Sequence, residues 1–168
     1  MSTLKVNALQ DTSGNNLSRV GQVVQTIKTD TTSTSSTSMT DCTGMSVTIT
    51  PTSTSSKILV TVIANVGAGS GYRAMLQLVR GSTAIGIGTS VGSRQACGMS
   101  SRDQDNGVTH NNVQRILDSP STTSATTYKL QWRNEYSNTM YLNRSVWDTN
   151  NDTYQRTASI IMAEELLQ

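Results

Sequence analysis

The side chains able to support catalysis are few and far apart in this chain. His110 is the only histidine, so it is the only imidazole that could serve one of the many serines as a general base. The one Gly-x-Ser-x-Gly sequence, GTSVG (88–92), begins a Gly- and Ser-rich stretch in which no helix is expected, so it lacks the strand–turn–helix context that presents a nucleophilic serine on a sharp turn. We therefore expect the protein not to be an enzyme.

Carboxylates held in pairs across a cleft would support glycoside hydrolysis. Three close pairs occur in the sequence: Asp103 with Asp105, Asp148 with Asp152, and Glu164 with Glu165. The first two pairs lie in polar segments and the third lies near the C-terminus. We expect all of them to be exposed to solvent rather than to form a tuned acid–base pair.

The segment from Asp148 to Asp152 places oxygen ligands at positions one, three and five, a spacing that can wrap a calcium ion. The glycine and glutamate that complete such a loop are replaced by Thr153 and Ser159. An ordinary Asx-rich turn is the preferred interpretation, with a bound cation as the alternative. No metal site is predicted.

Cys42 and Cys97 are the only cysteines, a number compatible with one disulfide. Two reduced thiols in or near the core are the preferred interpretation, and pairing is left open. The glycine-rich segment 67–71 lacks the helix and the Lys-Ser/Thr pair of a phosphate-binding loop, so it indicates a flexible turn. We predict no cofactor.

Aromatic side chains in the last third of the chain lie among Asn, Asp and Arg, a mixture that suits stacking on sugar rings and hydrogen bonding to hydroxyls. Arginines could add contacts to anionic surface polysaccharide. The candidate glycan contacts are Tyr136, Trp147, Tyr154, Arg73 and Arg94. The alternative is that Tyr141 and Trp147 pack in a strand or at a seam between subunits.

These residues must be positioned by β-strands, because helical periodicity and helix caps are missing almost throughout. Threonine, which favours strands, occurs 26 times and serine 23 times among 168 residues. Segment 57–66 is apolar on both faces, which indicates a central strand covered on its second side by another sheet or another subunit. Strands are expected at 21–28, 45–50, 57–66, 72–80, 84–88, 113–118, 126–132, 139–147 and 157–166, with weak ones between 89 and 112. The predicted fold class is all-β, a jelly-roll-type β-sandwich with an extended N-terminal arm.

The chain is long enough for one domain and an arm. The arm is assigned to residues 1–20 and the sandwich to 21–168, and the Ser/Thr-rich stretch 29–44 is interpreted as an extended edge segment or long loop of the sandwich. Hydrophobic residues make up only 35% of the chain, which hints at burial between subunits. The arm residues proposed for docking or oligomer contacts are Leu4, Val6, Leu9 and Leu17.

Charge and hydropathy exclude several classes of partner. The net charge is only +2 and the basic residues are scattered, which argues against nucleic-acid binding, because that requires clustered Lys and Arg. No apolar run is long enough to cross a bilayer, and the first residues do not resemble a signal peptide, so we expect no membrane insertion.

The order of the segments resembles that of a group of virion proteins of tailed phages, especially cyanophages and marine phages. The opening STLKVNALQDTSGNNL resembles the leader of many tail-fibre proteins of this type. The blocks TPTSTSSKILV and TTSATTYKLQW are the most specific, and the resemblance covers most of the chain. The matching segments are GQVVQTIKTD (21–30), SVTITPTSTSSKILVTV (46–62), MLQLVRGSTAIG (75–86), SPSTTSATTYKLQW (119–132) and ASIIMAEEL (158–166).

The group resembles the trimeric jelly rolls of the tumour-necrosis-factor and complement type. The resemblance implies a homotrimer located in the virion, made in the cytoplasm of a host bacterium and attached to other virion proteins of the tail or capsid. It implies either a fibre head or knob that contacts host surface polysaccharide, or a capsid decoration protein. Related fibre proteins often carry a long shaft, which this chain lacks.

Overall fold

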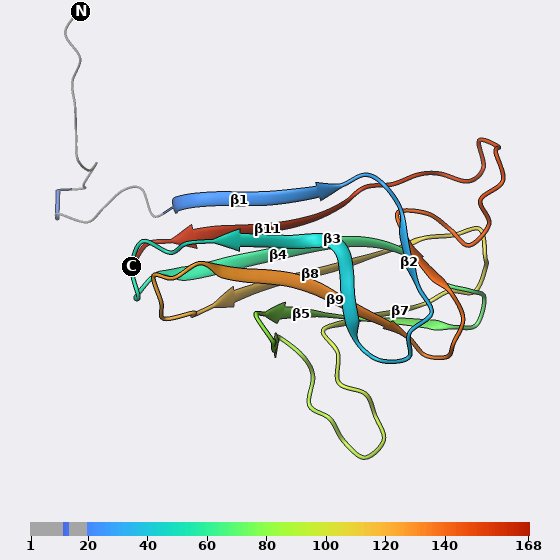
Figure 1. Cartoon of the computed structure of the whole chain (residues 1–168), viewed down its shortest axis with the longest axis horizontal. Coiled ribbons are helices and arrows are strands. Elements are labelled where there is room, and N and C mark those ends of the chain that lie inside the picture. Colours follow the sequence, from blue (N-terminus) through green and yellow to red (C-terminus); the bar gives the residue numbers. More distant parts are fainter. Residues whose placement is uncertain (1–11, 14–19) are drawn as a thin grey trace, which may run out of the picture.

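The chain folds into two antiparallel β-sheets that pack face to face (Figure 1). The structure is a computed structural model that describes residues 12–13 and 20–168, and the described part contains no helix, hence none that could span a membrane. The docking residues expected in the arm, from Leu4 to Leu17, lie outside the described residues. The strands are β1 (Val20–Lys28), β2 (Thr32–Thr34), β3 (Thr40–Ile49), β4 (Lys57–Gly67), β5 (Arg73–Arg80), β6 (Thr83–Ile85), β7 (Met99–Arg102), β8 (His110–Asp118), β9 (Thr126–Asn134), β10 (Met140–Leu142) and β11 (Ser159–Leu166).

The connections follow jelly-roll topology, which confirms the predicted fold class. In the first sheet, β1 pairs with β11, β11 with β4, and β4 with β8. The short strand β10 pairs with the end of β4 on the same edge as β11, and β2 pairs with β10. In the second sheet, β3 pairs with β9, β9 with β5, and β5 with both β6 and β7. The chain crosses repeatedly from one sheet to the other, so residues distant in sequence line one core.

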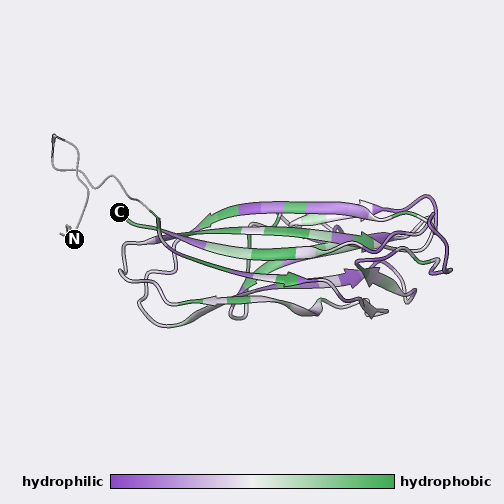
Figure 2. Ribbon diagram, turned by 90° about the horizontal axis from the view of Figure 1, so that it is seen from above, coloured by the Kyte–Doolittle hydropathy of each residue, from purple (hydrophilic) through white to green (hydrophobic). Residues whose placement is uncertain are grey.

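Alternation along the strands explains the core. In β9, Tyr128, Leu130 and Trp132 are buried and the residues between them are partly exposed, as strict period two predicts. The inner residues of β4 meet these side chains from the opposite sheet. Figure 2 shows that hydrophobic positions recur along the strands of both layers. Burial of these faces provides the main driving force for folding.

The Ser/Thr-rich stretch 29–44 contributes two strands at the margin of the fold. β2 is the edge strand of the first sheet, and the first half of β3 pairs with β9 before a bulge between Asp41 and Ser46. Gly44 sits in this bulge with φ of 81°, a conformation that glycine adopts without strain. The expectation of an extended edge segment is therefore confirmed, and β3 begins earlier than predicted.

The strand predicted at 139–147 is too long. β10 ends at Leu142, and Asn143 takes a positive φ of 64°, which turns the chain out of the sheet. The Asn143 side chain is buried and donates hydrogen bonds to the carbonyls of Lys28 and Asp30. Local composition did not reveal this turn, because distant parts of the chain hold it in place.

Glu165 is fully buried, which contradicts the expected exposure of the C-terminal carboxylates. Its oxygens accept hydrogen bonds from the Thr52 amide at 2.6 Å, the Thr52 hydroxyl at 2.7 Å and Gln22 Nε2 at 2.8 Å. Burial by itself would raise the pKa of this carboxyl, but the hydrogen bonds from Gln22 and Thr52 outweigh it and lower the pKa to about 2. Glu165 thus joins β1, β11 and the turn after β3.

We expect Glu165→Gln to destabilise the fold by about 2 kcal/mol at pH 7, because an amide cannot accept all of these hydrogen bonds. The folded pKa lies below the unfolded value, so the stabilisation is present above about pH 4.5 and is lost as the pH falls toward 2. Urea unfolding at pH 7 and pH 3 measures both effects. Glu135→Gln, in an exposed ion pair with Arg73, is the control. Equal losses in the two variants, or a Glu165→Gln loss as large at pH 3 as at pH 7, would contradict the assignment.

Candidate functional site

Four connections gather at one end of the sandwich, which we call the loop end: residues 68–72, 103–109, 135–139 and 143–158. In Figure 1 this end lies opposite the C-terminus and the start of β1. The strand directions require this arrangement, because β4, β9 and β10 finish where β5, β8 and β11 begin. The loops carry most of the aromatic and amide side chains singled out in the sequence.

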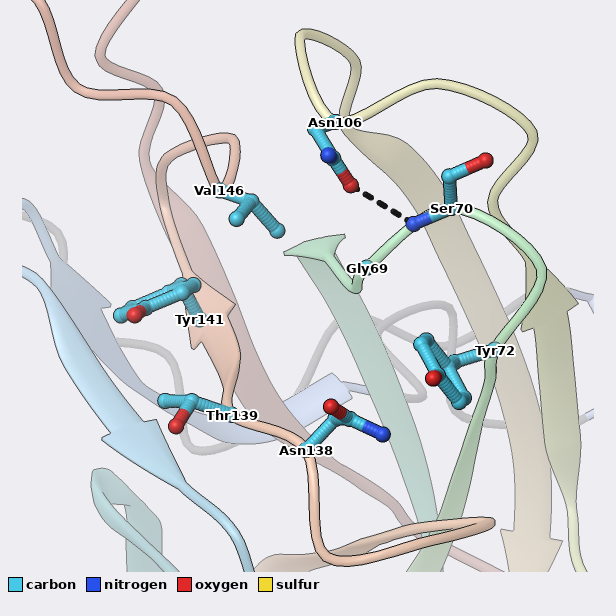
Figure 3. A pocket seen from close by; sticks show the side chains of 8 residues that line it. All are labelled: Gly69, Ser70, Tyr72, Asn106, Asn138, Thr139, Tyr141 and Val146. Atoms are coloured by element: carbon cyan, nitrogen blue, oxygen red, sulfur yellow. Dashed lines mark hydrogen bonds between the residues drawn. The ribbon is translucent and has the colours of Figure 1, made fainter.

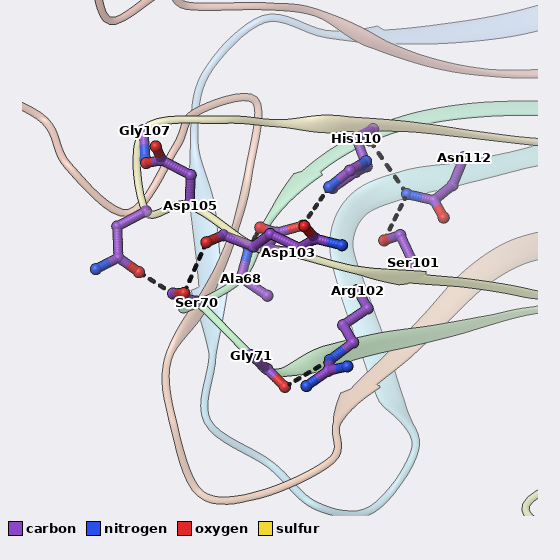
Figure 4. Close-up of polar contacts among 12 residues, drawn as sticks. Ala68, Ser70, Gly71, Ser101, Arg102, Asp103, Asp105, Gly107, His110 and Asn112 are labelled. Carbon is purple, nitrogen blue, oxygen red and sulfur yellow. Dashed lines mark hydrogen bonds and ion pairs between the residues drawn. The ribbon is translucent and has the colours of Figure 1, made fainter.

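Asp103 is the buried anchor of the loop end, although we expected it to be exposed. Its backbone exchanges hydrogen bonds with the β4–β5 connection, donating to Tyr72 O and accepting from Gly71 N. Its carboxylate accepts a hydrogen bond from the Ala68 amide and lies 2.9 Å from His110 Nε2 (Figure 4). One side chain therefore ties together the loops 68–72 and 103–109 and the start of β8.

Burial raises the pKa of the Asp103 carboxyl to about 6, against the opposing effects of the Ala68 amide and His110. No serine or cysteine is hydrogen-bonded to His110 within the described residues. The pair therefore lacks the nucleophile that a catalytic triad requires. Its geometry suits a structural role.

One cavity at the loop end, of about 310 Å³, lies between two tyrosines, and we call it the tyrosine cavity. Tyr72 and Tyr141 occupy its opposite walls, with Asn138 between them (Figure 3). Asn106 accepts a hydrogen bond from the Ser70 amide at 2.7 Å, which fixes the rim. Arg144 lies 3.6 Å above the Tyr141 ring and stiffens that wall.

A neighbouring cavity of about 360 Å³ is lined by Trp147 and Tyr154, and we call it the tryptophan cavity. The two rings meet edge to face, with centroids 6.0 Å apart and planes at 75°. A Cβ on Gly107 would lie 3.2 Å from the Tyr154 ring and 3.3 Å from the Trp147 ring, so only glycine fits without displacing them. Asp105 also lines this cavity and accepts the Gly107 amide hydrogen bond at 2.7 Å.

The structure brings together only two of the five predicted glycan contacts, Trp147 and Tyr154. Tyr136 is exposed and packs edge to face on Tyr72, and Arg73 pairs with Glu135 at 2.8 Å, outside both cavity linings. Arg94 lies in the separate connection between β6 and β7. The expected arginine contribution at this surface is therefore not assembled.

The segment 148–152 forms a turn stabilised by ion pairs. Asp148 contacts Arg156 at 2.5 Å and Arg144 at 3.5 Å, and Asn151 accepts the Thr153 amide hydrogen bond at 2.7 Å in an Asx turn. Within the part of the chain that the structure describes, no three His, Cys, Asp or Glu side chains converge as metal ligands. The Asx-turn interpretation accounts for the pattern.

Both cysteines are free thiols. Cys42 is buried in the core and Cys97 is partly exposed. Burial raises the pKa of Cys42 to about 12 and also raises that of Cys97, so neither is a reactive thiolate at neutral pH.

A second candidate surface is the outward side of β1, β11, β4 and β8, which we call the outer face. The strand register aligns Ile27, Ile160, Ile63 and Val113 in one row across the four strands. A second row contains Val23, Leu59 and Leu117 together with Glu164. Val23, Ile27, Val113 and Leu117 are each more than half exposed. No element of the described chain covers this face.

The outer face was only partly predicted. The apolar outward positions of β4 indicated a second covered side, but the neighbours of β4 could not be identified before the sheet order was known. Comparison of the sequence with protein-family models and with curated proteins finds no match.

We expect Asp103→Asn to remove the pH dependence of stability that this side chain contributes. The folded pKa is raised, so the stability contributed by Asp103 is full below about pH 3.8 and is lost as the pH rises through about 6. An asparagine still accepts the Ala68 hydrogen bond but bears no charge. Relative to the wild type, the variant should gain roughly 1–3 kcal/mol between pH 4 and pH 7.5 in urea unfolding.

Asp152→Asn, at an exposed position in the neighbouring loop, is the control and should shift less than 0.5 kcal/mol, as roughly expected for surface changes. A wild-type advantage over Asp103→Asn that grows with pH would contradict the raised pKa and the role of Asp103 as a buried anchor.

Proposed function

We propose that this protein is a non-enzymatic structural module of a phage particle that works as a homotrimer, with the outer face buried between subunits. The observation that carries the proposal is the extent of apolar surface on one side of the first sheet. Eight apolar side chains share it: Val23, Ile27, Leu59, Ile63, Val113, Leu117, Ile160 and Met162. A contiguous apolar patch of this kind is typical of an assembly surface.

The charges on the outer face favour a second copy of this chain as the occupant. Arg115 and Glu164 lie 4.0 Å apart, diagonally across β4 and surrounded by apolar residues. This central pair has no net charge, and Lys57, at the start of β4, is the other charged side chain on the outward side of these strands. A neighbouring subunit presents the same pair, so each arginine can meet a carboxylate across the interface.

Three copies, rather than two, are proposed because the sequence resembles trimeric jelly rolls. The low hydrophobic content of 35% supports assembly independently, since a chain with a small apolar share gains stability by burying an exposed sheet between subunits.

We place the protein at the tail, as a fibre head or knob. The residues before Val20 join the sandwich at the end opposite the loops, so a particle held through the N-terminal arm would direct the loop end outward. The resemblance of residues 2–17 to fibre leaders supports this orientation. The second candidate is a capsid decoration protein, the other role that the resemblance implies.

Sedimentation or native mass spectrometry at micromolar concentration should give a mass of three subunits. Val113→Asp should shift the mass toward one subunit, because three buried carboxylates without partners would oppose assembly. Val91→Asp is a matched control: both valines are 56% exposed, but Val91 lies in the β6–β7 connection away from the outer face. A single-subunit wild-type mass, or equal effects of the two variants, would contradict the proposed interface.

Antibody labelling of intact particles, read by electron microscopy, tests the location. We expect label at the tail. Label distributed over the head shell would replace the fibre-head proposal with the decoration proposal.

A further inference from the structure

The tryptophan cavity combines an exposed aromatic ring with polar side chains, the two features that a sugar-binding subsite requires. The Trp147 side chain is 48% exposed, although tryptophan side chains in folded proteins are mostly buried. Its backbone is held on both sides, since its amide donates to Asn106 O at 3.0 Å and its carbonyl accepts the Ser145 hydroxyl at 2.6 Å. An aromatic ring fixed in position and left open to solvent can stack on the apolar face of a pyranose.

Hydrogen-bonding groups lie beside this ring. One oxygen of Asp105 is used by the Gly107 amide, and the other makes no hydrogen bond to a described residue. A carboxylate oxygen at the edge of an aromatic platform accepts a sugar hydroxyl well, because hydrogen bonds to charged acceptors are the stronger ones. Thr153 and Gln155 line the same cavity.

The tyrosine cavity adjoins the tryptophan cavity. Asn106 and Val146 line the first, and the next residues in the chain, Gly107 and Trp147, line the second. The hydrogen bond from Trp147 N to Asn106 O joins the two segments at this boundary. Two cavities with aromatic walls on either side of one partition suit two neighbouring units of a sugar chain.

The charges at this surface favour an uncharged ligand. Asp105 is the only acidic or basic side chain in the two cavity linings. The nearby guanidinium groups of Arg144 and Arg156 share a single carboxylate, Asp148, so together with Asp105 these groups carry no net charge. A sulfated or carboxylated polysaccharide would meet Asp105 with no guanidinium in either cavity lining to compensate it.

We propose that the loop end binds an uncharged oligosaccharide, with one sugar unit stacked on Trp147 and hydrogen-bonded to Asp105, and the next unit in the tyrosine cavity. This inference deepens the proposed function and rests on its fibre-head form for its biological setting. The binding site itself lies within one subunit.

Tryptophan fluorescence tests the site in the full-length protein. Trp132 is 1% exposed, so acrylamide quenching reports Trp147 almost alone. The probes are neutral hexaoses of glucose, mannose and galactose, with heparin hexasaccharide as the anionic comparison. At least one neutral hexaose at millimolar concentration should protect Trp147, and heparin should not.

Tyr154→Ala should weaken the protection about tenfold, which corresponds to roughly 1.4 kcal/mol. Val91→Ala, which truncates an exposed side chain in the β6–β7 connection outside both cavity linings, should leave the affinity within about twofold. Thermal unfolding of each variant verifies its fold, and the wild-type titration tests the site even if a variant fails to fold.

No protection by any neutral hexaose, protection by heparin alone, or an equal loss in Val91→Ala would each overturn the inference. Failure here is distinguishable from failure of the proposed function. A three-subunit protein without sugar protection would refute only the saccharide site, and a one-subunit protein with protection would refute only the assembly.

Discussion

The structure depends on β4, a strand whose two faces are both apolar. Its inner residues form the middle of the core, and it pairs with β11 and β10 along one edge and with β8 along the other. The same backbone therefore sets the order of the first sheet and leaves Leu59 and Ile63 pointing outward. Because a β-strand alternates its side chains strictly, the second face cannot turn inward to join the core. The apolar outer face follows from that constraint.

The two buried carboxylates show how position determines chemistry in this fold. Glu165, at the end where β11 finishes, is surrounded by donors, and its pKa is lowered. Asp103, at the loop end, has one strong backbone donor and His110 as partner, and burial raises its pKa. Glu165 links the turn after β3 to β1 and β11, and Asp103 links the connection 68–72 to the start of β8. Buried charges remain acceptable only where such hydrogen bonds compensate them, so both ends of the sandwich are ordered by polar anchors rather than by further apolar packing.

The strand topology separates the loop end from the outer face. Antiparallel strands deliver the four connections of the loop end to one end of the sandwich, whereas the outer face runs along the length of the first sheet. In the proposed trimer, association through the sheet would thus leave the loops accessible. A rigid sandwich that positions variable loops is a common way of presenting a recognition surface, and here the glycine at position 107 and the Asn106–Trp147 hydrogen bond give the loop end its shape.

Period-two alternation in the sequence by itself determined the fold class, most of the strands, and the buried faces of β3, β4 and β9, because alternation is a local property of extended backbone. It also identified Trp147 and Tyr154 by residue type. Only the tertiary structure decided which of the aromatic and charged residues meet. Asp103 and Glu165 look like surface carboxylates in sequence, but partners 35 and 113 residues away bury them. Long-range pairing placed Arg73 and Arg94 away from the cavities and turned the chain at Asn143. Such contacts depend on strand order and register, which no local pattern encodes.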